Sequence, residues 1–275
     1  MPRTQSSLAI TSSGREWYLL NASPDIRTQL ERTPSLHPRR GVRDSPVAGV
    51  VLTNADVDHV AGLLSLRESQ PLILYATRRV LAVLAANSVF DVLRHDLVAR
   101  VPLDLDTAVA LTSPDGTPSG VTVETFSVPG KVALYLEDPS AGADFGTVAE
   151  DTIGLKITEI ETGRSFFYIP ACARLSPPIV GRIAGAPLVF FDGTTWTDDE
   201  MRSSGAGVKT AGRMGHMSVT GADGSLEAFA RLGVPRKIFI HINNTNPLLL
   251  ADSPERAIAE AAGWEIAFDG REVKA

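Results

Sequence analysis

The pattern of apolar and polar positions predicts many short strands with helices between them. Residues 5–10 and 16–22 flank a turn and predict a β-hairpin. Residues 47–53 form an apolar run typical of a strand buried on both faces, and residues 60–68 space their leucines as a helix does. The polar segment 54–59 is predicted to be a loop at the carboxyl end of a strand, where α/β folds place their sites.

The rest of the chain continues this alternation. Further strands are predicted at residues 71–76, 121–128, 153–160, 165–169, 187–192, 237–241 and 264–268, and further helices at residues 78–86, 198–203, 225–232 and 253–262. Residues 103–120 indicate a mixture of short strand and turn. Residues 130–152 indicate a long exposed loop, which either covers a site or is a plain solvated insertion.

Strands dominate both halves of the chain, with helices between them. We therefore expect an α/β (α+β) fold in which two mixed sheets stack between helical layers, rather than a doubly wound parallel sheet. The expected architecture is a four-layer αββα sandwich, with residues 1–275 forming one domain.

Composition narrows the possible partners. The 275 residues include 26 basic and 32 acidic side chains, a formal net charge of −6, so a nucleic-acid partner is not expected. No apolar run approaches the roughly 18 residues that span a bilayer, and the first residues do not resemble a secretory signal, so we expect a cytoplasmic protein.

Cysteine usage restricts the metal chemistry. Cys172 is the single cysteine, so the chain cannot form an internal disulfide or a cysteine-based zinc site, and we expect a buried apolar role for its side chain. Any metal site must therefore use histidine and carboxylate ligands.

Potential metal ligands follow three predicted strands. Asp56, Asp58 and His59 follow the first of these strands, Asp192 ends the second and His241 ends the third. Because the carboxyl ends of neighbouring strands meet at one edge of a sheet, these groups can converge on one metal ion. The alternatives are a turn and helix cap for Asp58 and His59, and a structurally satisfied histidine for His241.

The same residues resemble a known superfamily. The order of a strand, residues 54–59 (NADVDH), a helix, Asp192 and His241 resembles the metallo-β-lactamase fold, whose loop usually reads His-x-His-x-Asp-His. Four longer stretches resemble the pyrroloquinoline quinone biosynthesis protein B family: residues 3–7 (RTQSS), 21–27 (NASPDIR), 214–216 (MGH) and 241–247 (HINNTNP). This resemblance runs from residue 2 almost to the end of the chain.

Departures from the pattern lead to further expectations. Asn54 and Asp56 replace the two histidines of the first metal site, and Lys131 lies where a Gly-His pair is usual. The resemblance then leaves one site, with Asp58, His59 and His241 as ligands and Asp192 as a fourth. Family members usually start earlier, with a strand and a zinc-binding cysteine cluster, so we expect an N-terminally short chain without structural zinc and with an unpaired sheet edge beside residues 5–10.

The resemblance implies a reaction. It implies one divalent metal, Fe(II) or alternatively Zn²⁺, and O₂-dependent hydroxylation of the tyrosine ring in a cross-linked Glu-Tyr intermediate of pyrroloquinoline quinone (PQQ) biosynthesis. The alternatives are a carrier that transports PQQ or its precursor to the periplasm and a Zn-dependent hydrolase. Other PQQ biosynthesis proteins and a second copy of the chain are the expected protein partners.

Additional residues are candidates for the chemistry. His216 is interpreted as a substrate contact or general acid or base, or as a solvated loop histidine. Asp56 is either a ligand or a group that orients His59. The candidates for binding substrate carboxylates are basic, with ordinary surface charge as the alternative: Arg27, Lys131, Lys209 and Arg213.

Overall fold

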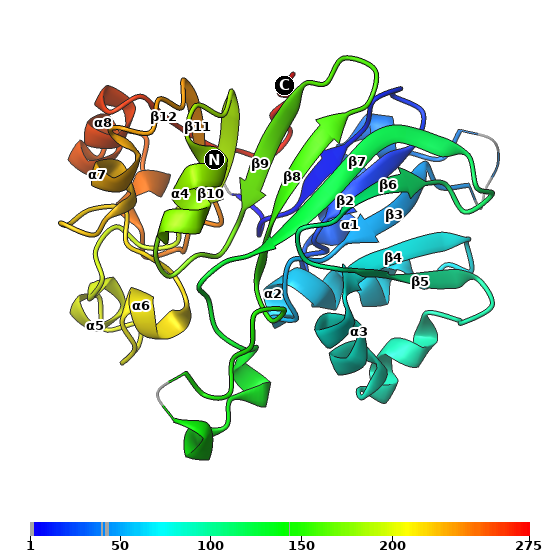
Figure 1. Cartoon of the computed structure of the whole chain (residues 1–275), viewed down its shortest axis with the longest axis horizontal. Coiled ribbons are helices and arrows are strands. Elements are labelled where there is room, and N and C mark those ends of the chain that lie inside the picture. The colour runs from blue at the N-terminus through cyan, green and yellow to red at the C-terminus, as the bar shows by residue number, and fades with distance from the viewer. Residues whose placement is uncertain (1–2, 40, 42–43, 143) are drawn as a thin grey trace.

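Two β-sheets face each other at the centre of the protein (Figure 1), in a computed structural model that describes residues 3–39, 41, 44–142 and 144–275. The first sheet has the strand order β1-β2-β3-β4-β5. Its strands are β1 (Leu8–Ile10), β2 (Trp17–Leu20), β3 (Val47–Val51), β4 (Leu72–Thr77) and β5 (Val98–Leu103). β1 and β2 form the predicted antiparallel hairpin, and the other neighbours are parallel.

The second sheet has the order β12-β11-β10-β9-β8-β7-β6. Its strands are β6 (Ala108–Thr112), β7 (Pro118–Ser127), β8 (Ile153–Glu159), β9 (Ser165–Ile169), β10 (Leu188–Asp192), β11 (Arg236–Ile240) and β12 (Trp264–Ile266). Strands β6 to β9 pair in an antiparallel way, while β9 to β12 are parallel. The carboxyl ends of β10 and β11 therefore lie side by side, as their sequence pattern predicts.

Helices cover the outer faces of both sheets. The α-helices are α1 (Ile26–Arg32), α2 (Val57–Val60), α3 (Arg78–Ala85), α4 (Pro177–Ile183), α5 (Glu200–Ser203), α6 (Ala211–Met214), α7 (Ser225–Phe229) and α8 (Pro254–Ala261). Short 3₁₀-helices lie at Pro34–Leu36, Ala61–Leu66, Ser88–Val92, Leu134–Leu136, Pro139–Ala141 and Pro247–Leu249. Among the described residues, no helix combines the length and apolar character that crossing a membrane requires.

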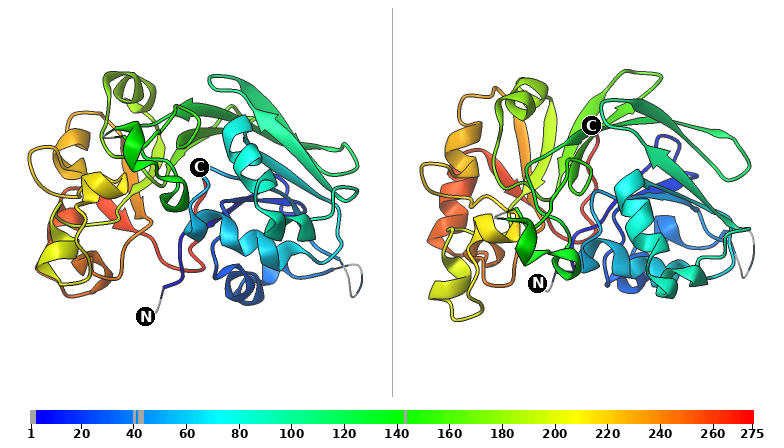
Figure 2. Two further views of the ribbon diagram at one scale, coloured as in Figure 1. Left: turned by 90° about the horizontal axis from the view of Figure 1, so that it is seen from below. Right: turned by 60° about the horizontal axis from the view of Figure 1, so that its bottom comes forward.

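Apolar side chains fill three layers, which confirms the predicted αββα sandwich. One cluster joins the inner faces of both sheets, with Tyr18 and Tyr75 from the first and Tyr168 from the second. A second packs α1 and α3 against the first sheet, and a third packs α4, α7 and α8 against the second. Figure 2 shows the N-terminal helices, blue to teal, and the C-terminal helices, yellow to red, on opposite sides of the strands.

Local differences from the predictions concern the segments around the site. The helix predicted at residues 60–68 begins earlier, as α2 (Val57–Val60), and continues as the 3₁₀-helix Ala61–Leu66. Asp58 and His59 therefore lie on a helix and not in the predicted loop. The mixed region 103–120 consists of the end of β5, the whole of β6 and the start of β7.

The predicted long loop at residues 130–152 joins β7 to β8 and contains two 3₁₀ turns. It protrudes as the green lobe at the bottom of Figure 1. Leu134, Tyr135 and Val148 are exposed on it. Its two ends are nevertheless tied to the body of the protein, because Thr152 forms an isolated β-bridge with Asn54 and Val128 N donates to Thr152 O.

Candidate metal centre

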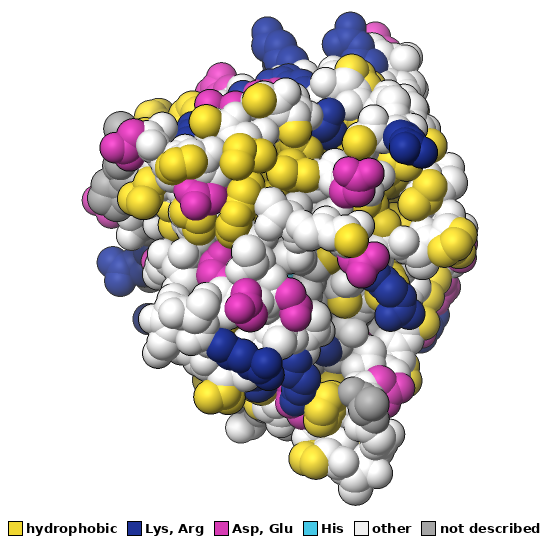
Figure 3. Space-filling view, turned by 90° about the vertical axis from the view of Figure 1, so that its left-hand side faces the viewer, with side chains coloured by type: hydrophobic (Ala, Val, Ile, Leu, Met, Phe, Trp, Pro, Cys, Tyr) yellow, Lys and Arg dark blue, Asp and Glu magenta, His cyan; other side chains and the backbone are white. Residues whose placement is uncertain are grey.

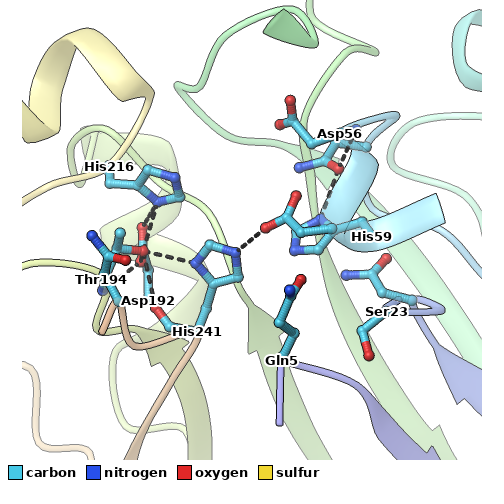
Figure 4. A network of polar contacts seen from close by, with 12 residues as sticks. Gln5, Ser23, Asp56, His59, Asp192, Thr194, His216 and His241 are labelled. Atoms are coloured by element: carbon cyan, nitrogen blue, oxygen red, sulfur yellow. Dashed lines mark hydrogen bonds and ion pairs between the residues drawn. The ribbon is translucent and has the colours of Figure 1, made fainter. Parts of the chain in front are cut away.

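A first group of possible metal ligands joins the two sheets. Asp58 and His59 come from α2, which follows β3 of the first sheet, and His241 follows β11 of the second. Their donor atoms all lie within 4.8 Å of one another. His241 Nε2 is 2.8 Å from Asp58 Oδ2, and Figure 4 shows His59 and His241 close to each other.

The orientation of His59 is fixed by Asn54. Asn54 Oδ1 accepts from the backbone N–H of Asp56 at 3.0 Å and lies 2.7 Å from His59 Nδ1. The contact with the backbone N–H identifies this Asn54 atom as the amide oxygen, which has no proton to donate. His59 must therefore donate to it, so the proton of neutral His59 is on Nδ1. The lone pair is then on Nε2, which is buried and has no hydrogen-bond partner among the described residues. This is the state in which imidazole binds metal ions.

The charges of the first group are coupled. Burial lowers the pKa of His59 to about 4 in spite of the neighbouring Asp58, so this imidazole is neutral. Burial alone would raise the pKa of Asp58, but the hydrogen bond from His241 and the electrostatic effect of the surrounding histidines lower it. Burial alone would lower the pKa of His241, but the hydrogen bond and charge of Asp58, with the charges of Asp192 and Asp56, raise it.

A second group shares His241. Asp192, His216 and His241 also present donor atoms within 4.8 Å of one another, and Asp192 is fully buried at the end of β10. Asp192 Oδ2 lies 2.7 Å from His216 Nδ1 and accepts from Cys172 N–H, while Oδ1 accepts from the amide and hydroxyl of Thr194. Burial alone would raise the pKa of Asp192, but the effects of His216, His241 and the Thr194 hydrogen bond together lower it.

Thr194 connects the members of this second group. Its hydroxyl is 2.6 Å from Asp192 Oδ1 and 2.7 Å from His241 Nδ1. Because the hydroxyl has one proton and the carboxylate only accepts, Thr194 donates to Asp192 and accepts from His241 Nδ1–H. Of the two nitrogens of His241, Nδ1 is thereby engaged and Nε2 faces Asp58.

Backbone conformation places the two histidines. His241 has φ = +52°, a left-handed conformation that costs energy for a residue with a Cβ and is concentrated at functional sites. His216 follows α6, which ends at Gly215 with φ = +91°. His216 is not the solvated loop histidine of the alternative interpretation, because α6 forms directly before it and its side chain is only 13% exposed.

Asp56 lies at the start of α2 but in neither donor group of the described chain. Its Oδ1 accepts weakly from Lys131 Nζ at 3.5 Å and from Leu134 N at 3.4 Å. Orientation of His59, one of the two roles predicted for Asp56, is supplied by Asn54. A catalytic role for Asp56 stays a prediction.

Three of the four basic candidates meet at Glu137. Arg213 binds both carboxylate oxygens of Glu137, at 3.1 and 2.6 Å, and Lys131 and Lys209 have ion-pair distances of 3.9 and 3.8 Å to it. Arg27 is exposed on α1 and forms no hydrogen bond or ion pair with this cluster in the described structure. The structure thus groups Lys131, Lys209 and Arg213 and leaves Arg27 apart.

Other residues at the site did not stand out in the sequence. In the sequence, Asn54 stands out only as the replacement of a metal-binding histidine, and nothing there assigns Thr194 or Gln5 a role at the site. Gln5 is exposed, and its side chain extends toward His59 and His241 in Figure 4. A signal for Asn54 exists in its spacing, five residues before His59, but only the bend into α2 brings the two side chains together.

Cys172 is buried as predicted. Burial and the nearby Asp192 raise the pKa of its thiol to about 12, so it is not a nucleophile at neutral pH. Its backbone N–H, rather than its sulfur, serves the site by binding Asp192.

Two stacked sheets with a histidine and carboxylate centre at their shared edge define a protein of the β-lactamase superfamily, and the family model of the beta-lactamase superfamily domain matches residues 16–242. Coenzyme PQQ synthesis protein B of Gluconacetobacter diazotrophicus is 55% identical over 98% of this chain and 87% of its own length. That of Rhodopseudomonas palustris is 51% identical over 99% of this chain and 89% of its own. The structure of Zn²⁺-bound PqqB from Methylobacterium extorquens has a TM-score of 0.93 and 48% identity, covering 100% of this chain and 89% of that one. The chain belongs to the PqqB family.

Proposed function

We propose that the chain is a metalloenzyme of PQQ biosynthesis that hydroxylates the tyrosine-derived ring of a cross-linked Glu-Tyr intermediate, using one Fe(II) and O₂. The single observation that carries the metal assignment is the buried Nε2 of His59, which has no hydrogen-bond partner among the described residues. A buried acceptor left unpaired is costly, and a metal ion would satisfy it.

The donor set supports this metal chemistry. Asp58, His59 and His241 would hold the ion, with Asp192 as the candidate fourth ligand. Two imidazoles and one carboxylate are the ligands of non-haem Fe(II) sites that activate O₂, although Zn²⁺ accepts the same donors. Asp192 is a weaker candidate ligand than the other three residues, because both of its carboxylate oxygens already have hydrogen-bond partners in His216, Cys172 and Thr194.

His216 is suited to proton transfer. When its Nδ1–H donates to Asp192 Oδ2, its Nε2 is left as an acceptor. Its side chain is 13% exposed, and its ring stacks on that of His241 with 5.1 Å between the ring centroids. We assign His216 the role of base for the phenol proton, with Asp192 as the group that holds its tautomer.

Zinc is the alternative metal, favoured by the Zn²⁺-bound structure of the relative. A hydrolase with two metal ions is less consistent with the residues here. Asn54 Oδ1 is engaged with His59 and the Asp56 amide, and the Asp56 carboxylate contacts Lys131, so both positions of the usual first site have other partners.

The metal assignment is tested by His59→Ala, with His95→Ala on the surface as the control. Protein purified without oxygen should bind one ion per chain at the centre, His95→Ala should match it, and His59→Ala should lose that ion. Retention of one ion with unchanged affinity in His59→Ala would refute the assignment.

The reaction is tested by loading the chain with Fe(II) or with Zn²⁺ and adding O₂ and a tyrosine-derived diacid. Mass spectrometry should show the addition of oxygen to the ring with iron and none with zinc. If the zinc form turned over and the iron form did not, the hydroxylase would be replaced by a hydrolase. Binding of the diacid with no turnover by either form would favour a carrier.

A further inference from the structure

Glu137 lies in a receptor built for a carboxylate. Three cationic side chains reach it, and Arg213 binds it through two parallel N–H···O contacts. Its side chain is only 11% exposed, and the hydrogen bond from Arg213 lowers its pKa, so it is a carboxylate at neutral pH. Paired contacts from a guanidinium are the geometry by which proteins recognise carboxylates.

Lys131 lies in the same loop as Glu137, but the other two cationic residues come from a different segment. Glu137 belongs to the loop between β7 and β8, whereas Lys209 and Arg213 belong to the segment that leads through α6 to His216. Phe145 of the same loop lies under the Arg213 guanidinium at 3.7 Å. On the face shown in Figure 3, Lys and Arg side chains gather in the lower part, beside acidic ones. The loop is therefore held against α6 by the contacts of the Glu137 carboxylate and the Phe145 ring with Arg213.

A neighbouring part of the loop, at Leu134 and Tyr135, is held on the side of the first donor group. Tyr135 OH donates to Ala55 O at 2.9 Å, and Leu134 N is 3.4 Å from Asp56 Oδ1. Residues 134–142 and 144–150, which we call the strap, thus extend from the start of α2 to α6, with a donor histidine close to each of these helices: His59 on α2 and His216 after α6.

The charges do not cancel. Lys131, Lys209 and Arg213 contribute three positive charges, against the two negative charges of Glu137 and Asp56. A second carboxylate is therefore attracted to the cluster, and a ligand with two carboxylates can displace the single one of Glu137. Replacing the Glu137 carboxylate by a ligand carboxylate costs little free energy, because the three cationic side chains are already in place.

We infer that Lys131, Lys209 and Arg213 form a binding site for small dicarboxylates, that Glu137 is its internal occupant, and that ligand entry releases the strap. This inference rests on the proposed function in that the substrate is a diacid. The receptor itself does not depend on the metal or on the oxidation.

The test measures binding of glutarate by calorimetry to the full Zn²⁺-loaded chain, with no turnover involved. Glu137→Gln removes the competing charge, so glutarate should bind about fivefold more tightly than to the wild type, since an internal competitor lowers the apparent affinity. Arg213→Gln should abolish this binding, which also separates the receptor from direct binding of glutarate to zinc. The matched control is Glu265→Gln, which removes a carboxylate paired with Arg236 and Arg271 and should leave glutarate affinity unchanged.

Hydrogen exchange supplies a second readout. In the wild type, glutarate should increase exchange of the strap amides, while in Glu137→Gln they should exchange quickly from the start. If Glu137→Gln does not fold, Glu137→Asp, whose shorter side chain withdraws the carboxylate from Arg213, should show the same tighter binding. Unchanged glutarate affinity in the folded variant, or no effect of glutarate on strap exchange, overturns the inference. Glutarate affinity and strap exchange do not depend on turnover. Failure of the hydroxylation assay alone therefore counts against the proposed function and not against this inference.

Discussion

At the scale of single residues, Asn54 determines what His59 can do. The Asn54 amide oxygen fixes the imidazole proton on Nδ1 and leaves Nε2 for a ligand. Groups that bind the second nitrogen of a ligating histidine commonly contribute 10–100-fold to metal affinity. A residue that stands in place of a histidine of the usual first site thus orients the imidazole of His59, the candidate ligand.

Asn54→Ala should weaken binding of the metal by about 10–100-fold while the stoichiometry stays at one, because His59 remains but its ring is free to turn. Competition with a chelator of known affinity measures the change. Asn87→Ala, which removes an amide that donates to Val83 O at the end of α3, is the control and should bind metal normally. Unchanged affinity in Asn54→Ala would show that packing alone orients His59.

The sequence predicted which candidate residues come together better than it predicted the hydrogen bonds between them. Asp58, His59, Asp192 and His241 all lie at the centre, because strand ends and the apolar runs before them are visible in the pattern. The contact of His216 with Asp192 could not be predicted, since 24 residues and the short helix α6 separate them. Hydrogen bonds between such distant positions depend on packing that no local periodicity records.

At the scale of elements, the position of α2 depends on a close backbone contact. Gly62 lies directly after α2, and a Cβ there would be 2.1 Å from Ser23 O and 2.7 Å from Ala22 O. The same contact is stabilised by Gly62 N, which donates to Ala22 O, and by Ala22 N, which donates to His59 O. The helix that carries Asp58 and His59 thus rests on the segment after β2.

Gly62→Ala should destabilise the fold by about 1–3 kcal/mol, because backbone atoms have to move to make room for the methyl group. It should also weaken metal binding, since α2 moves with them. Gly181→Ala is the matched control: Gly181 lies exposed in α4 with nothing within 4 Å of its added Cβ, and this change should stabilise the fold by about 0.4–1 kcal/mol. Denaturant unfolding measures both. Equal stability of the two variants would mean that α2 can shift without cost.

The strand pattern was predicted well and the helix boundaries around the site were not. β3, β8, β9 and β10 appear close to their predicted positions because each is an uninterrupted apolar or alternating run between turn residues. The start of α2 was missed because Asp56 and Asp58 look like loop residues, while in the structure Asp56 is the residue before the helix and Asp58 lies in its first turn. Acidic residues at a helix start are favoured by the helix dipole, so their polarity there does not exclude helix.

At the scale of the whole molecule, a metal ion at the first donor group would connect the two sheets. Asp58 and His59 follow the first sheet and His241 follows the second. Bound metal should therefore stabilise the fold, by about 4 kcal/mol when the free ion is at roughly a thousand times its dissociation constant.

Thermal unfolding with and without a chelator measures this stabilisation. The melting temperature should fall when metal is removed from the wild type. Asp58→Asn, which removes one donor, should show a much smaller difference, and His95→Ala should behave as the wild type does. A melting temperature that does not respond to metal removal would place the ion at a site that does not link the sheets.

The contact between Asp58 and His241 spans 183 positions of the chain. Because a protein is made from its N-terminus, Asp58 and His59 leave the ribosome long before His241 exists, and two neighbouring side chains alone bind metal ions weakly. The centre is completed only when nearly the whole chain has emerged and the second sheet has docked on the first. An abundant wrong ion would therefore meet no complete site on the unfinished chain, and a metal ion bound at this centre would mark a chain whose synthesis and folding are complete.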